Sequence, residues 1–304
     1  MTLQPQSIGV KQTEPLPPPL ADALPGIGHL TGDKLKPDAR NLTMLRGADL
    51  PGTDGEPMEN EREDFQIHLA LDCLNQHWRD RDDFYTGGNM FVYYSIPQAQ
   101  AVLEELKHPE RPKRAFRGPD MFVILNIDGS FRRQKWVVWE EKGRHPDVIF
   151  EFLSPSTRKT DLSIKKRIYE RTFKTYEYYC FDYLNPNRED SLFGWRLDRR
   201  GAYQMIAADS RGWLWSEKLE LFIGRWSGCY NRDNTVWMRF YQTNGELVPT
   251  LAEAAQQHAE AAQQRAEQEA YKSEQQARRA EQANKRTEKL VAQLRAMGVE
   301  PDLG

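Results

Sequence analysis

Hydrophobic residues recur at helical spacing in the stretch that begins at residue 59. In ENEREDFQIHLALDCLNQHW, four residues separate Phe65 from Leu69 and Leu69 from Cys73, with further apolar residues beside them. Apolar residues at this spacing form one face of an amphipathic helix. The pattern therefore predicts a helix over 59–78.

Four runs rich in aromatic and β-branched residues predict strands. They are the part of 84–95 after its Gly-Gly pair, DMFVIL at 120–125, DVIFEFL at 147–153 and YEYYCFD at 176–182. A helix is predicted over 161–173, and short strands near 193–197, 203–206 and 219–223. This order of elements predicts an α/β domain over residues 58–248, in which helices flank a mixed β-sheet.

The two ends of the chain have a different composition. Prolines and glycines punctuate residues 1–57 without a sustained period of 2 or 3.6, which predicts an extended arm. Within that arm, Leu42, Met44 and Leu45 are close enough together to anchor a short helical turn.

From Ala252 the sequence falls into seven-residue blocks such as AEAAQQH, AEAAQQR and AEQEAYK, and six of them carry Glu in second place. Ala, Glu, Gln, Lys and Arg are strong helix formers, so 249–304 should form a helical tail. Its heptad seam is mostly alanine, with large apolar residues only at Leu290, Leu294 and Met297. Both a solvated single helix and a weakly self-associating coiled coil, giving a homo-oligomer, fit this pattern.

Charge and cysteine content narrow the classes of protein. With 42 Lys+Arg against 45 Asp+Glu, the formal charge is −3, which excludes binding of nucleic acid by bulk positive charge alone. Cys73, Cys180 and Cys229 form neither a disulfide framework nor a zinc cluster. The N-terminal sequence lacks the features of a signal peptide, and no apolar run is long enough to span a membrane. We therefore expect a cytoplasmic protein.

Three charged residues on predicted elements suggest a reactive site. Asp120 opens one strand after a proline, and Glu151 lies inside the apolar strand DVIFEFL, where a carboxylate needs a partner. In the helix that follows, Asp161, Lys165 and Tyr169 are spaced by four and share a face. Two carboxylates can hold a divalent cation while an ammonium stabilises charge on a phosphate, so this set suits metal-assisted phosphodiester hydrolysis. Turn capping by Asp120, a structural role for Glu151 and a solvated Lys165 are the alternatives.

The run GPDMFVIL, followed by WEEKGRHPDVIFEFLSPSTRKTDLSIKKRIYERTFKTYEYYCFD, resembles the Uma2-type family of bacterial endonucleases. The resemblance spans about 59–225 and places the chain in the PD-(D/E)XK nuclease-like superfamily. It implies a restriction-endonuclease-like core, hydrolysis of DNA and a Mg²⁺ cofactor that Mn²⁺ can replace. It further implies that Asp120 and Glu151 are the metal ligands.

The usual superfamily motif is Glu-x-Lys on one strand, but Leu153 stands where the lysine would be. The resemblance implies that the lysine has moved to the following helix, onto Lys165, and the adjacent Lys166 is the alternative. It also implies an acidic residue on the first helix. Glu63 is the candidate for this catalytic role, with Glu59 or Glu61 in reserve, although acids favour helix N-termini regardless of function.

Several other polar residues are expected to be structural. Asp147 lies four residues from Glu151, roughly 13 Å along the strand and too far to share one metal ion. Ser154 and Thr157 fit the start of a helix, and no Gly-x-Ser-x-Gly motif surrounds Ser154. The histidines show no metal-ligand spacing. The tryptophans fit packing better than base stacking.

Cations bracket the proposed metal position and are candidates for contacts with DNA phosphates. They are Arg111, Lys113, Arg114, Arg117, Arg132, Arg133, Lys135, Arg158 and Lys159. Solvated loop charge explains them equally well. The sequence thus favours a Mg²⁺-dependent endonuclease acting on DNA. The rival hypotheses are an inactive nuclease fold that binds nucleic acid or assembles with partners, and a hydrolase of smaller phosphodiesters.

Overall fold

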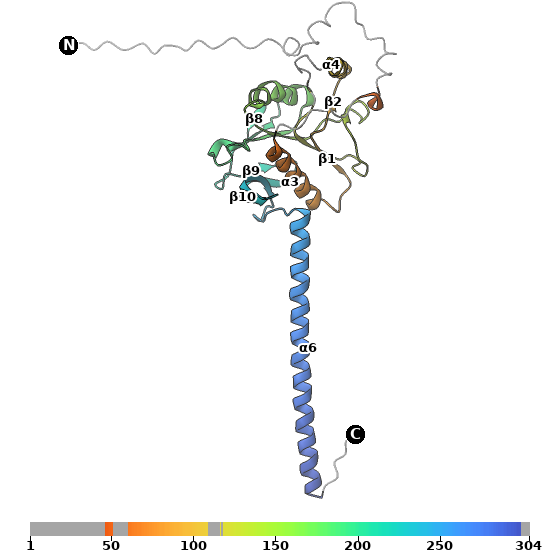
Figure 1. The fold of residues 1–304 in the computed structure, drawn as a ribbon, viewed down its shortest axis with the longest axis vertical. Helices are drawn as coiled ribbons and strands as arrows, with labels where there is room; N and C mark the ends of the chain where they lie inside the picture. Colours follow the sequence, from red (N-terminus) through yellow and green to blue (C-terminus); the bar gives the residue numbers. More distant parts are fainter. Residues whose placement is uncertain (1–45, 51–59, 109–115, 117, 299–304) are drawn as a thin grey trace, which may run out of the picture. The chain divides into compact units, whose positions relative to one another are not determined.

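The computed structural model describes residues 46–50, 60–108, 116 and 118–298 (Figure 1). The expected extended arm over 1–57, with its turn at Leu42, Met44 and Leu45, lies almost entirely outside these residues. A short 3-10 turn, η2 (Gly47–Asp49), is the element described there. The chain divides into two compact units, Met1–Val248 and Pro249–Gly304, which we describe separately.

A six-stranded mixed sheet forms the centre of the first unit, in the order β1-β3-β5-β6-β7-β8. Its strands are β1 (Phe84–Gly88), β3 (Met121–Leu125), β5 (Val148–Phe152), β6 (Glu177–Phe181), β7 (Leu192–Leu197) and β8 (Tyr203–Met205). β5 and β6 run parallel, with Glu151 opposite Cys180, and the other neighbouring strands are antiparallel. The predicted mixed α/β fold is confirmed.

One face of the sheet packs against α3 (Glu61–His77), the helix expected over 59–78. Asn60 caps α3 by accepting a hydrogen bond from the Arg62 amide. A second sheet of β9 (Leu214–Ser216), β10 (Leu221–Tyr230) and β11 (Asp233–Tyr241) completes this core (Figure 1). The pattern predicted only a short strand near 219–223, because Gly224, Gly228 and neighbouring charged residues obscure the alternation of β10.

The opposite face of the sheet is covered by the segment 158–173. It comprises an α-turn, α5 (Arg158–Thr160), followed by two stretches of π-helix, η3 (Asp161–Lys165) and η4 (Ile168–Phe173). The predicted helix over 161–173 therefore begins three residues earlier, and most of it has wider turns than an α-helix. In these turns the amide of Lys166 reaches back five residues to the carbonyl of Asp161.

A smaller core lies beyond β1, where α4 (Ile96–Lys107) packs near the parallel pair β2 (Val92–Tyr93) and β4 (Trp136–Val137). Ser95 caps α4 by accepting a hydrogen bond from the Gln98 amide. A 3-10 turn, η5 (Glu189–Ser191), precedes β7.

In the residues that the structure describes, the second unit forms one helix, α6 (Leu251–Ala296), which confirms the expected helical tail (Figure 1). Thr250 and Glu253 form a reciprocal capping box at its start, which satisfies two backbone amides that would otherwise lack partners. Within the described ranges, no helix is both long and apolar enough to cross a membrane.

Candidate active site

Strand alternation directs Glu151 toward the π-helical segment. Along β5, Phe150 and Phe152 belong to the core on the α3 side, whereas Ile149 and Leu153 belong to the core on the other side. Glu151 has the same parity as Ile149 and Leu153, and its side chain is completely buried. The strand therefore places a carboxylate beneath the segment 158–173.

Asp120 reaches the same place from the neighbouring strand. It directly precedes β3, whose residue Met121 lies opposite Phe150 of β5. The Asp120 carboxylate accepts a hydrogen bond at 2.7 Å from the amide of Phe152. This bond fixes the Asp120 side chain beside the residue that follows Glu151.

Lys165 joins three carboxylates. Its Nζ lies 2.8 Å from Glu151 Oε2, 3.0 Å from Asp161 Oδ1 and 3.9 Å from Asp120 Oδ1. Glu151 and Asp161 are fully buried, whereas the side chains of Lys165 and Asp120 keep 18% of their surface exposed. Solvent therefore reaches the cluster from the side of Asp120 and Lys165.

Two tyrosines hold this arrangement from within the core. The Tyr169 hydroxyl donates a hydrogen bond at 2.5 Å to Glu151 Oε1, the oxygen that Lys165 leaves free. The Tyr178 hydroxyl donates to the backbone carbonyl of Asp161 at 3.1 Å. Both tyrosines are buried, so the carboxylate and the helix turn are fixed before any ligand binds.

Burial and mutual charge shift the protonation of the cluster. Burial, together with the negative charge of Asp120, raises the pKa of Glu151 well above its ordinary value. Burial also raises the pKa of Asp161. Desolvation opposes the charged form of Lys165, but the three carboxylates outweigh it and raise the pKa of this ammonium. Lys165 therefore stays charged at neutral pH.

The oxygen donors of this cluster are of the type that binds hard divalent cations. With all three carboxylates ionised, the cluster including the Lys165 ammonium would carry a formal charge of −2, which a divalent cation would neutralise. Neither oxygen of buried Asp161 has a partner at hydrogen-bonding geometry, even though Lys165 lies within ion-pair distance. The described residues contain no group of three or more His, Cys, Asp or Glu placed to hold a metal ion. Mg²⁺ commonly uses one or two carboxylates, with water and substrate phosphate completing its shell.

The two candidate lysines point to different surroundings. Lys166 Nζ lies 4.0 Å from the centre of the Trp195 ring, and burial lowers the pKa of Lys166. Only Lys165 of the two is in contact with the carboxylates. Sequence reasoning left this choice open because both residues lie on the same short helix.

Among the contacts given for the described residues, none joins Glu63 to the carboxylates around Lys165. Its Oε2 accepts a hydrogen bond at 2.9 Å from the Tyr183 hydroxyl. Tyr183 packs with Tyr179 and Phe181 in the core on the α3 side, across the sheet from Glu151. Of the reserve acids, Glu61 begins α3, and Glu59 lies outside the described residues.

The residues expected to be structural have structural contacts. Asp147 accepts hydrogen bonds from the Leu125 amide at 2.9 Å and from Arg144 at 3.0 Å. The Ser154 hydroxyl accepts a bond from the Thr157 amide at the start of the 158–173 segment. Asp147 therefore fixes the opposite end of β5 from the carboxylate cluster.

The candidate phosphate-binding cations have different environments. The Arg133 side chain is buried against Tyr85 and Trp136 and paired with Glu141. It is therefore not exposed for the contact with DNA phosphates that the sequence suggested. Lys135 donates to the carbonyl of Leu50. The remaining three described candidates differ in accessibility: Arg158 pairs with Asp182 at 3.1 Å, while Arg132 and Lys159 are exposed. Arg111, Lys113, Arg114 and Arg117 lie outside the described residues.

Sequence reasoning gave Asp161 and Tyr169 no place among the site residues. The four-residue spacing from Asp161 through Lys165 to Tyr169 was the available signal. Sequence reasoning also overlooked a further buried carboxylate, Glu177, which pairs with Arg196 at 2.9 Å and accepts a hydrogen bond from the Glu217 amide. Glu177 ties β6 to the turn after β9 and is structural.

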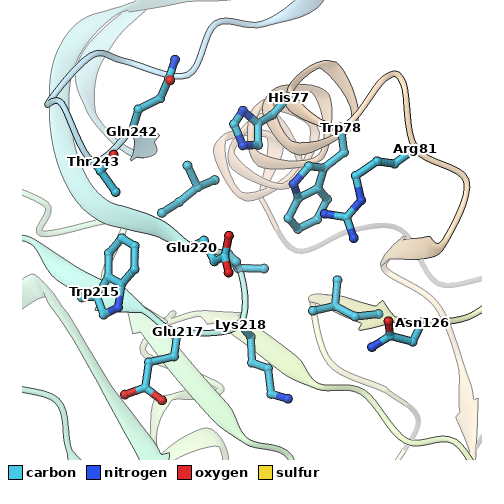
Figure 2. Close-up of a pocket in the computed structure, with 13 residues that line it drawn as sticks. His77, Trp78, Arg81, Asn126, Trp215, Glu217, Lys218, Glu220, Gln242 and Thr243 are labelled. Carbon is cyan, nitrogen blue, oxygen red and sulfur yellow. The ribbon is translucent and has the colours of Figure 1, made fainter.

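A cleft of about 730 Å³ lies at the end of β3 remote from Asp120 (Figure 2). Its lining includes Trp78 and Arg81 after α3, Trp215 from β9 and Gln242 after β11. It contains none of the carboxylates that surround Lys165. The cleft therefore does not form part of the candidate site.

A comparison with family models identifies the family of the chain. The model described as "Uma2: Putative restriction endonuclease" matches residues 55–227, more than half of the chain. The match includes every described residue of the carboxylate cluster and its two tyrosines. No curated protein matches the chain.

Proposed function

Since the chain belongs to the Uma2 family, a family of nuclease type, we propose that it is a metal-dependent endonuclease that hydrolyses DNA phosphodiester bonds. The observation that supports this most directly is the contact of Lys165 Nζ with Glu151 and Asp161, with Asp120 at 3.9 Å. A charged, partly exposed ammonium beside two candidate metal ligands matches the needs of phosphodiester hydrolysis.

Asp120 and Glu151 are the proposed metal ligands, with Mg²⁺ as the cofactor and Mn²⁺ as a substitute. When bound, such an ion would polarise a phosphoryl oxygen and lower the pKa of a bound water. The Phe152 amide holds Asp120, and the Tyr169 hydroxyl holds Glu151, so the two ligands are positioned before the ion arrives. Because the pKa of Glu151 is raised, ion binding should release protons from the cluster.

Lys165 is the proposed catalytic cation. Its ammonium would orient the attacking water or donate to a non-bridging phosphate oxygen as negative charge develops there. The buried carboxylate of Asp161 lies 3.0 Å from this ammonium, and the raised pKa of Lys165 keeps the proton on it. Glu63 remains a predicted auxiliary acid, and its bond to Tyr183 would have to be exchanged for that role.

The proposed partner is DNA, with exposed Lys159 and Arg132 and the partly exposed Arg158 as phosphate contacts. We also propose a cytoplasmic location, which suits the three free cysteines.

The rival function is a nuclease fold that binds nucleic acid without cutting it. The observation that favours it is Leu153, which occupies the usual position of the catalytic lysine and packs in the core. Incubation of supercoiled plasmid with purified protein and Mg²⁺ separates the two hypotheses. Nicking that EDTA stops and that the Asp120→Asn variant lacks supports the enzyme, whereas retention of plasmid on a gel without nicking supports the binding protein.

A further inference from the structure

The last turns of α6 expose an apolar face. Leu290, Leu294 and Met297 follow one another at spacings of four and three, and their exposed fractions are 52%, 38% and 78%. Residues with this spacing lie on one side of a helix. In the described residues of the second unit, this is where large apolar side chains gather.

The same side continues along the helix as the seam of a heptad repeat. Written as abcdefg from Ala252, Leu294 is at position a, and Leu290 and Met297 are at position d. Alanine fills most of the earlier a and d positions, which lets helices approach closely but buries little area. Glu269, Ser273 and Gln276 interrupt the middle of the seam. Association through this face would therefore be concentrated in the last turns.

The two flanks of the seam carry different charges. On one flank, every position g from the second block to the fifth is basic: Arg265, Lys272, Arg279 and Arg286. Positions e on the other flank are uncharged, and the row of glutamates at position b lies just beyond them. Within the part of the helix that the structure describes, the four basic residues make no ion pair, whereas Glu274 and Glu281 pair with Arg278 and Lys285.

We propose that this face binds a second copy of the chain, with the two α6 helices parallel and in register. In a parallel pair, position g of each helix faces position e of the other, so each basic flank meets the uncharged flank bordered by glutamates. In an antiparallel pair, position g faces position g, and the basic rows would repel each other. The charge pattern therefore favours a second copy of α6 as the partner and a parallel orientation of the two helices.

This inference does not depend on the proposed function, because it uses only residues of α6. The covalent connection adds a consequence. The first unit ends at Val248 and α6 begins at Leu251, so in a parallel pair both nuclease-like units are attached to the same end of the paired helices. One assembly would then carry two carboxylate clusters.

Sedimentation of the full chain over about 1–100 µM tests the association. We expect the mass to rise with concentration toward twice the 35.4 kDa of the monomer. The double variant Leu290→Ser/Leu294→Ser should stay monomeric, while Ala292→Ser at outward position f should behave as wild type. A wild type that is monomeric throughout, or a double variant that still dimerises, would overturn the proposal.

Disulfide trapping tests the direction. In a Cys229→Ser background, which leaves two buried cysteines, Leu290→Cys should form linked dimers on mild oxidation because position d meets its own copy in a parallel pair. Ala292→Cys should link at least tenfold more slowly. Equal rates for the two variants, or no linkage at Leu290→Cys in a protein that sediments as a dimer, would exclude the parallel arrangement.

Discussion

Lys165 Nζ lies 2.8 Å from Glu151 Oε2, although the two residues are fourteen positions apart and come from different elements. A lysine two residues after Glu151 would lie on the same face of the strand and would approach the same carboxylate along the strand. Here Leu153 packs in the core, and the ammonium comes from the helix above the strand. Tertiary packing therefore places the ammonium beside Glu151. Lys165 can be replaced without changing any residue of the strand that carries Glu151.

Replacing Lys165 by methionine should lower cleavage about 100- to 1000-fold, as expected when one charged donor to the reacting phosphate is lost. The matched control is Lys166→Met, which removes the contact of Lys166 with the Trp195 ring and leaves the carboxylate cluster unchanged. Plasmid nicking under identical Mg²⁺ concentrations measures both. Full activity of the Lys165 variant would remove this residue from the mechanism.

Asp120→Asn should weaken Mn²⁺ binding about 10- to 100-fold, because it removes one negatively charged ligand with little change in volume. Calorimetric titration of the protein without DNA gives the affinity directly. Asp190→Asn is a suitable control, since Asp190 is an exposed carboxylate paired with Arg188. Unchanged affinity in the Asp120 variant would place the ion elsewhere.

Glu151→Gln should become more stable relative to wild type as pH rises. The pKa of Glu151 is raised in the folded chain, mainly by burial, from an ordinary value of 4.5. The folded wild type therefore holds this proton to higher pH than the unfolded chain does, and it loses stability as pH rises from about 4.5 through the folded pKa. Thermal melts of both proteins in EDTA from pH 5 to 8 measure the difference in melting temperature. This difference should increase with pH in favour of the variant. A difference that narrows over this range would contradict the raised pKa.

Glu177→Ala should destabilise the fold by about 3–5 kcal/mol, the usual cost of breaking a buried ion pair by removing one partner. Glu177 is fully buried, and it loses Arg196 and the Glu217 amide together. Urea unfolding measures this cost, with exposed Glu189→Ala as the control. An effect below about 1 kcal/mol would show that Glu177 is not a structural residue.

One of the three cysteines should react rapidly with a thiol reagent in the native protein. Cys229 is exposed, whereas Cys73 and Cys180 are buried, and burial raises the pKa of the Cys180 thiol well above its ordinary value. Colour release from an aromatic disulfide reagent should show one fast thiol in wild type and none in Cys229→Ser. Two or more fast thiols would mean that the core opens.

Residue type and spacing predicted the central strands and the C-terminal helix of this fold. The apolar runs at 120–125, 147–153 and 176–182 correspond to β3, β5 and β6, and the alanine-rich heptads form α6. The long hairpin of β10 and β11 was underestimated because glycines and charged residues obscure the alternation of β10, and because the contact of β11 with α3 is not visible in local sequence. The π-helical turns also lack a signal in residue type.

The site was predictable to the extent that it depends on spacing. Asp120 and Glu151 lie at neighbouring strands, and Lys165 lies on the helix face that covers them. The three side chains therefore converge. The burial of Asp161 depends on the covering core, and the bond of Glu63 to Tyr183 depends on which face of the sheet Tyr183 occupies. Neither relationship follows from local sequence. The catalytic roles of these residues remain predictions.

The π-helical turns impose a constraint on chain length as well as on composition. Backbone bonds that span five residues, from Lys166 to Asp161 and from Lys174 to Tyr169, accommodate one more residue than an α-helical turn would. Deleting a single residue between Lys165 and Tyr169 would rotate Tyr169 by about 100° and carry its hydroxyl away from Glu151. Relatives that keep this cluster should therefore vary in length within the surface loop 206–213 and hold a fixed number of residues from Asp161 to Phe173.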